Sequence, residues 1–180
     1  MSEKSRTKYI VLGMLTIQPS SGYEINKMIK SSTNYFWSES EGQIYPALAK
    51  CVEDGLATCK ETLGNARVKK VYSITAKGRK VLSEWLKKEP QNALVRSEFL
   101  LKIFFAGNIE NKYAIAHLTK FHNDAQQELE QLEKIKIELG SCVQSLNKHA
   151  IFWMLSVDSG IKAAKADLAW SKEAIATLTS

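Results

Sequence analysis

Cysteine, histidine and proline are scarce in this chain, which has three of each among its 180 residues. The cysteines (Cys51, Cys59 and Cys142) are odd in number, widely spaced and outside any CxxC motif. They therefore predict neither a disulfide framework nor a zinc site, and they fit a reducing cytosol. The histidines are too few and too dispersed for a metal centre. A phosphate-binding loop, paired catalytic carboxylates and a nucleophile–base constellation are missing as well. We therefore expect no metal, no cofactor and no enzymatic activity.

Long apolar runs are also missing, since no segment approaches the ~20 residues that a membrane-spanning helix needs. Residues 9–17 form an apolar stretch, and the basic residues before it give the order of a signal peptide. However, Gly13 interrupts the stretch, Gln18 and Pro19 follow it, and no small-residue cleavage site is present. We interpret the stretch as a buried first helix, and we expect a cytoplasmic protein with no membrane partner.

Excess positive charge is confined to one half of the chain. Residues 1–90 carry fifteen Lys and Arg against nine Asp and Glu, whereas residues 91–180 carry ten of each. The formal net charge of +6 therefore lies in the first half, as in a protein that binds nucleic acid through one domain. Chance clustering can give the same distribution, so the motifs have to decide.

Residues 42–54 have the pattern of a short amphipathic helix. Ile44, Leu48 and Val52 recur at every fourth position and predict a buried stripe. The outward positions hold side chains that can hydrogen-bond base edges and phosphates or contact them: Gln43, Tyr45, Pro46 and Lys50. An ordinary surface helix has the same pattern, and the flanking segments are needed to choose.

Two earlier helices are predicted, over residues 8–16 and 21–31. Ser21 with Glu24 three residues later fits a capping box, and Ser40 with Gln43 predicts a second helix start. Pro46 lies beyond the first turn of that later helix, which therefore either starts near Gln43 or is bent where it begins. Three helices in this order, the last with a polar outer face, predict a helix-turn-helix.

A hairpin is predicted after this motif, from residues 57–63 and 68–74 around a Gly64-Asn65-Ala66 turn. Its tip and return strand carry three cations: Arg67, Lys69 and Lys70. Such a hairpin can lie along DNA phosphates as a wing, or it can be a solvated hairpin whose lysines prevent edge-to-edge aggregation. A fourth helix, over residues 76–89, follows and is expected to bury Leu82, Trp85 and Leu86.

Several of these segments, in this order and spacing, resemble the PadR family of bacterial transcriptional regulators over residues 8–88. The segments are Ser21-Gly22-Tyr23-Glu24-Ile25, Phe36-Trp37, Gly42-Gln43-Ile44-Tyr45-Pro46, Gly55-Leu56, Val71-Tyr72-Ser73-Ile74-Thr75, Gly78-Arg79 and Trp85-Leu86. Arg96-Ser97-Glu98-Phe99 and Ala169-Trp170 resemble landmarks of the C-terminal domain in the longer PadR subfamily, which includes regulators of phenolic-acid detoxification and of virulence genes.

The resemblance implies a winged helix-turn-helix dimer, usually a repressor, whose recognition helices enter adjacent major grooves. Glu39 and Glu41 depart from this pattern, because they place negative charge at the start of the recognition helix, where neutral or basic residues are expected. Attraction to the helix dipole can account for them, at about 0.3–1 kcal/mol each.

The second half is predicted to be helical, beginning after a break at residues 89–92. Residues 98–106 form a short, nearly all-apolar helix that we expect to be buried from several directions, and two long amphipathic helices follow it. These exceed what a small winged domain can cover, so a second copy of the chain is expected, with an intramolecular hairpin as the alternative. The predicted dimerisation residues are Leu118, Phe121, Leu129, Leu132, Ile135, Leu139, Ile161 and Leu168.

The sequence thus predicts a mainly α fold with a small β-hairpin: a winged helix-turn-helix domain (residues 1–90) followed by a three-helix dimerisation domain (residues 91–180). We expect a dimeric, sequence-specific repressor that binds double-stranded DNA at a pseudo-palindromic operator and releases it when a small effector binds. The expected DNA-binding residues are Tyr23, Ser40, Gln43, Tyr45, Pro46, Lys50, Arg67, Lys69 and Lys70. Phe152, Trp153 and Trp170 are core side chains or contacts for a small aromatic effector. The alternative function is a helical adaptor that binds protein through its winged domain.

Overall fold

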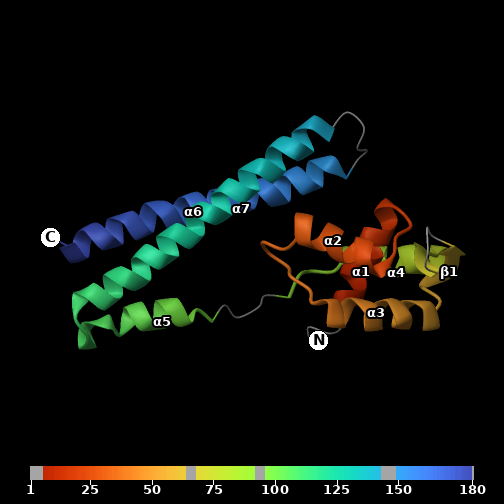
Figure 1. Ribbon diagram of the computed structural model, residues 1–180, viewed down its shortest axis with the longest axis horizontal. Coiled ribbons are helices and arrows are strands. Elements are labelled where there is room, and N and C mark those ends of the chain that lie inside the picture. Colours follow the sequence, from red (N-terminus) through yellow and green to blue (C-terminus); the bar gives the residue numbers. More distant parts are fainter. Residues whose placement is uncertain (1–5, 64–67, 92–95, 143–148, 180) are drawn as a thin grey trace. The chain divides into compact units, whose positions relative to one another are not determined.

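The computed structural model describes residues 6–63, 68–91, 96–142 and 149–179. It consists of two compact units, residues 1–92 and residues 93–180, and each is described by itself (Figure 1).

The first unit combines helices with a two-stranded hairpin. Its elements are α1 (Thr7–Ile17), α2 (Gly22–Ser32), α3 (Glu41–Glu53), β1 (Ala57–Leu63), β2 (Val68–Ile74) and α4 (Ala76–Leu86). The strands are antiparallel, with Ala57 opposite Ile74 and Leu63 opposite Val68. Ser20 adds a short bridge to β2, because its N–H donates to the Tyr72 carbonyl (3.0 Å) and its carbonyl accepts from the Tyr72 N–H (2.9 Å). This bridge fixes the wing to the chain just before α2.

One apolar core holds the helices of this unit together. Ile44 and Leu48 from α3 are fully buried with Leu12 of α1 and with Ile25 and Ile29 of α2. The predicted inward stripe of the third helix is therefore confirmed. Burying side chains of this size contributes about 1.5–3 kcal/mol each, so the core sets how α3 is presented.

Local signals in the sequence set the ends of these helices. Ser21 and Glu24 form the predicted capping box, and the Thr75 hydroxyl accepts from the Gly78 N–H (3.0 Å) at the start of α4. Gly55 follows α3 with a φ of +69°, the left-handed conformation that glycine adopts without strain. Pro46 lies inside α3, which begins at Glu41. The chain therefore starts this helix earlier than Gln43.

The fourth helix departs from its prediction in length and burial. It ends at Leu86, and this last residue is 65% exposed, whereas Leu82 is buried. Trp85 stacks on Tyr9 of α1 with 4.3 Å between ring centroids. The expectation that Leu86 is buried is therefore wrong, because Trp85, the residue before it, makes the contact with α1.

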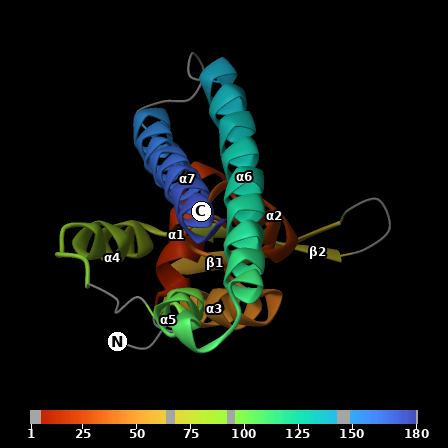
Figure 2. The same cartoon turned by 90° about the vertical axis from the view of Figure 1, so that its left-hand side faces the viewer.

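The second unit is a hairpin of two long helices with a short helix beside it. Its elements are α5 (Glu98–Phe104), a 3₁₀ turn η2 (Ala106–Asn108), α6 (Asn111–Cys142) and α7 (Ala150–Thr179). Helices α6 and α7 run antiparallel along one another (Figure 2). Helix α6 continues without a break through Gly140. None of the helices in the described ranges is both long and apolar enough to cross a bilayer.

The composition of α5 predicted burial from several directions, and this prediction is wrong. Phe104 is 81% exposed, and Leu100, Leu101 and Phe105 are exposed as well. Within one chain α5 packs mainly against η2 and α6, and its Phe99 also contacts Trp170 of α7. Among the described residues, its other large apolar side chains remain exposed. An apolar face of this kind needs a partner.

Candidate nucleic-acid interface

The outward face of α3 presents the side chains that the sequence placed there. Tyr45 is 49% exposed, Pro46 and Lys50 are exposed, Ser40 is exposed just before the helix, and Gln43 is half-buried. Ile44 and Leu48 hold the opposite face in the core. The helix therefore offers a mixed polar and aromatic surface on a rigid support.

Gln43 caps its own helix. Its Oε1 accepts hydrogen bonds from the Ser40 N–H (3.2 Å) and the Ser40 hydroxyl (3.0 Å). These bonds occupy the amide oxygen and leave the amide NH₂ as the donor that can reach a base edge. Gln43 can thus donate to an acceptor on DNA while it keeps its place in the cap.

Tyr45 packs against the first residue of α2. A Cβ atom on Gly22 would lie 2.5 Å from Tyr45 Cε1, so the ring fits only because Gly22 lacks a side chain. Tyr23, the next residue, is exposed. The absent side chain at position 22 therefore brings two tyrosines from different helices to one part of the surface.

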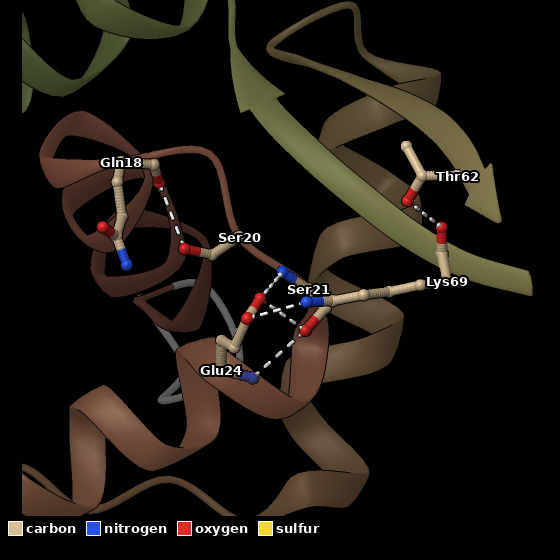
Figure 3. Close-up of polar contacts among 6 residues, drawn as sticks. All are labelled: Gln18, Ser20, Ser21, Glu24, Thr62 and Lys69. Atoms are coloured by element: carbon tan, nitrogen blue, oxygen red, sulfur yellow. Dashed lines mark hydrogen bonds and ion pairs between the residues drawn. The ribbon is translucent and has the colours of Figure 1, made fainter. Parts of the chain in front are cut away.

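Lys69 is held by an ion pair between the wing and α2. Its Nζ donates to Glu24 Oε1 at 2.7 Å, and Glu24 Oε2 accepts from the N–H and the hydroxyl of Ser21, each at 2.8 Å (Figure 3). The Lys69 ammonium and then the Ser21 donors stabilise the carboxylate, which lowers the pKa of Glu24 from 4.5 to about 2. The contact joins two residues 45 positions apart.

The other cationic site residues also have acidic neighbours. Lys50 pairs with Asp54 (3.1 Å) and Glu53 (3.2 Å), and the hydrogen bond to Asp54, then the one to Glu53, raises the pKa of the Lys50 ammonium. Lys70 lies 4.0 Å from Glu61 on the neighbouring strand. Arg67 lies outside the described residues. The three predicted lysines thus lie beside carboxylates in the free protein.

Glu39 and Glu41, the two residues that depart from the family pattern, hold the helix-turn-helix together. Glu39 is buried, and it accepts from the Thr7 hydroxyl (3.2 Å) and from the Trp37 indole N–H (2.8 Å). Glu41 accepts a short hydrogen bond from the Asn26 side-chain amide on α2. Sequence reasoning missed the contacts with Thr7 and Asn26, because no local pattern marks partners 32 and 15 residues away.

The predicted dimerisation residues are used largely inside one chain. Leu118 and Leu132 are each 1% exposed and Ile161 is 5% exposed, since they pack between α6 and α7. The others are half-buried: Phe121, Leu129, Ile135, Leu139 and Leu168. The large apolar side chains left exposed on α5 and just after it are Leu100, Leu101, Phe104, Phe105, Ile109 and Tyr113.

The predicted effector residues lie at two separate places on α7. Trp170 makes edge contacts with Phe99 (6.0 Å between centroids) and Phe121 (5.7 Å), which stack on each other. Phe152 and Trp153 lie near the start of α7, about 25 Å from Trp170 at 1.5 Å per residue. One chain therefore does not bring the three residues into one site.

Comparison with known proteins identifies the family. Residues 11–84 match the family described as "Transcriptional regulator PadR-like family", and residues 95–179 match "Virulence activator alpha C-term". The chain is also similar to the "Negative transcriptional regulator PadR" of Bacillus subtilis, with 35% identity over 109 residues. This match covers 59% of the chain and 60% of that protein, so it spans about three fifths of the relative's length.

Solved structures extend the similarity over nearly the whole chain. A crystal structure of Bacillus subtilis PadR in complex with operator DNA has a TM-score of 0.83 and 27% identity, covering 95% of this chain and 98% of that one. A crystal structure of the same regulator in complex with p-coumaric acid shares the fold, with a TM-score of 0.81, 24% identity and coverage of 100% and 99%. The helix-turn-helix, the wing and the helical second unit accordingly identify this chain as a member of the PadR-like family of transcriptional regulators.

Proposed function

We propose that this chain is a homodimeric, sequence-specific DNA-binding regulator that represses transcription from a pseudo-palindromic operator and acts in the cytoplasm. The observation that carries the proposal is the outward face of α3, held rigidly by the core beside a basic wing. The operator complex of the Bacillus subtilis relative supports it, because that fold is similar over 95% of this chain.

The residues divide into base-reading and phosphate-positioning roles. Gln43 donates its amide NH₂ to a base edge in the major groove, with Ser40 and Pro46 beside it. Tyr23, Tyr45 and Lys50 position the phosphates next to α3, and Arg67, Lys69 and Lys70 contact the backbone from the wing. Contacts of the second kind carry no sequence information by themselves.

Salt dependence and a substitution at Gln43 test this assignment. Each phosphate neutralised by Lys or Arg releases counterions, so a dimer making about six such contacts should lose about 10³-fold in affinity between 50 and 200 mM salt. Gln43→Ala should cost about 1–3 kcal/mol on the operator and little on random DNA. A folding defect weakens binding to both DNAs, so the ratio of affinities isolates the base contact.

Two outcomes would reject parts of the proposal. Equal losses on both DNAs for Gln43→Ala would remove that residue from base reading. Salt-insensitive binding, with no footprint on the promoter of the chain's own gene, would favour the adaptor function instead.

The dimer interface is proposed to include the exposed face of α5 rather than the buried α6–α7 seam. Leu101 and Phe104 are available to a second chain, whereas Leu118 and Leu132 are already covered. Two winged units joined in this way can place their recognition helices about 34 Å apart, one turn of DNA. Tethering makes the second contact intramolecular and raises affinity by ~10²–10⁴.

A small aromatic effector, with phenolic acids as the first compounds to test, is proposed to release the operator. The p-coumaric acid complex of the Bacillus subtilis relative motivates the choice, and the ring cluster of Phe99, Phe121 and Trp170 is the group to monitor. A ligand relieves repression only if it prefers the conformation that does not fit DNA. Tryptophan fluorescence quenching together with loss of operator binding supports this role, and a broad screen without either effect rejects it.

A further inference from the structure

Glu24 is the acidic residue that joins two parts of the proposed DNA-binding face. Its contact with Lys69 links the start of α2 to strand β2, whereas Lys50 pairs along its own helix and Lys70 pairs across its own hairpin. The ion pair is the shortest of the three sets, at 2.7 Å. Among the described wing lysines that pair with an acidic residue, Lys69 is therefore the one that a residue outside the hairpin restrains.

The carboxylate is fixed from its other side. The Ser21 N–H and hydroxyl both donate to Glu24 Oε2, and the Glu24 N–H donates back to the Ser21 hydroxyl (3.3 Å). These bonds keep the carboxylate in place, and a pKa of about 2 keeps it ionised. When DNA approaches, the negative charge stays where it is, and Lys69 has to leave it or divide its donors between Glu24 and a phosphate.

We propose that Glu24 is an internal counter-ion that competes with DNA phosphate for Lys69 and thereby lowers the affinity of the protein for DNA of any sequence. The inference rests on the proposed function, since it requires Lys69 to contact the DNA backbone. An ammonium that already has a carboxylate partner gains less from a phosphate than a free one does. Its transfer to DNA also yields less net ion release, because the vacated carboxylate attracts a cation from solution.

Glutamine is a matched substitution at this position. A capping box accepts Gln as well as Glu three residues after its Ser, so Glu24→Gln keeps the helix start and removes only the charge. We expect Glu24→Gln to raise affinity for both operator and random DNA by about two- to fivefold per subunit, the range of an exposed ion pair. The plot of log affinity against log salt should steepen by up to about 0.9 per subunit.

A double-mutant cycle separates this pair from the general effect of removing a negative charge. Operator and random-DNA affinities are measured at several salt concentrations for the full-length wild type, Glu24→Gln, Lys69→Gln and the double variant. In the Lys69→Gln background we expect Glu24→Gln to change affinity by less than half as much, on a logarithmic scale, as it does in the wild type. An equal gain in both backgrounds overturns the inference, and so does weaker DNA binding by Glu24→Gln, which would make Glu24 a positioning residue for Lys69.

A second measurement needs no DNA. Acetic anhydride labels free lysine amines in the intact chain. Digestion and mass spectrometry of the peptides then compare the labelling of Lys69 with that of Lys60 on β1, which serves as an internal reference. Lys69 should be labelled more slowly in the wild type than in Glu24→Gln, and equal labelling overturns the inference. A wild-type chain that binds neither DNA overturns the proposed function together with the inference. Normal operator binding with additive substitutions overturns the inference alone.

Discussion

Replacing Gly22 with alanine is expected to weaken operator binding more than it weakens the fold. The new Cβ would lie 2.5 Å from Tyr45 Cε1, whereas carbon atoms in contact are about 3.5–4.0 Å apart, so the ring must move by at least ~1 Å. Tyr45 is half-exposed and can swing into solvent. Gly22 is the first residue of α2, where alanine recovers up to ~1 kcal/mol of helix propensity. The free energy of unfolding should therefore change by less than about 1 kcal/mol.

The loss in binding follows from the displaced tyrosine. A hydrogen bond to a charged phosphate contributes about 1.5–3 kcal/mol, so losing the Tyr45 contact should reduce operator affinity at least about tenfold. Fluorescence anisotropy with operator DNA measures the affinity, and urea unfolding measures the stability. In a Tyr45→Ala background, Gly22→Ala should have no further effect on binding. Unchanged operator affinity for Gly22→Ala, or an equal loss without the Tyr45 ring, would refute the reasoning. Gly13→Ala is the control, because nothing lies within 4 Å of its added Cβ.

Four substitutions, at Gly78, Gly13, Glu24 and Phe104, test other parts of the structure. Gly78→Ala should destabilise the first unit by about 2 kcal/mol, because the added Cβ would overlap the Leu56 backbone carbonyl. Gly13→Ala should instead stabilise it by about 0.5–1 kcal/mol, since nothing lies within 4 Å of its added Cβ. Hydrogen exchange of residues 6–63 measures both changes. The pKa of Glu24 is lowered from 4.5 to about 2, so its carboxylate stabilises the fold above pH 4.5 and loses that contribution as pH falls through 2. Solvent screening limits the contribution to ~1 kcal/mol, and acid titrations of Glu24→Gln should lack it. Phe104→Lys should give a folded monomer by analytical ultracentrifugation, since this side chain is 81% exposed in one chain, and a dimer that persists would exclude α5 from the interface.

Local signals explain why much of the first unit could be predicted. The strands lie at the predicted residues 57–63 and 68–74, because β-branched runs and turn residues mark a hairpin within a short stretch of chain. The capping pair Ser21 and Glu24 likewise marks a helix start within four residues. The predicted burial of Leu86 depended on a contact with a residue elsewhere in the chain, and it was wrong.

The heptad spacing of the second unit shows where sequence reasoning stops. A seam through Leu118 and Leu132 demands a facing helix, but the spacing does not state whether that helix comes from the same chain or another. In this structure α7 is the facing helix. The exposed apolar residues of α5 were then misassigned to a buried core, because composition reports that a face must be covered and not by what. The same limit applies to Trp153 and Trp170, whose separation along α7 follows only from the helix being continuous.

The acidic residues around α3 change how the positive charge of the first unit is to be interpreted. Glu39 and Glu41 direct their oxygens at Thr7, Trp37 and Asn26, so their charge stabilises the helix-turn-helix and opposes no cation that the proposal assigns to DNA. Glu24 differs from both, because its Oε1 accepts from Lys69, a cation that the proposal assigns to DNA. A net charge counts these three carboxylates alike, although only the last competes with phosphate. Electrostatic attraction for DNA should therefore follow the partner of each lysine rather than the sum of charges, and changing Glu24 should alter it far more than changing Glu39 does.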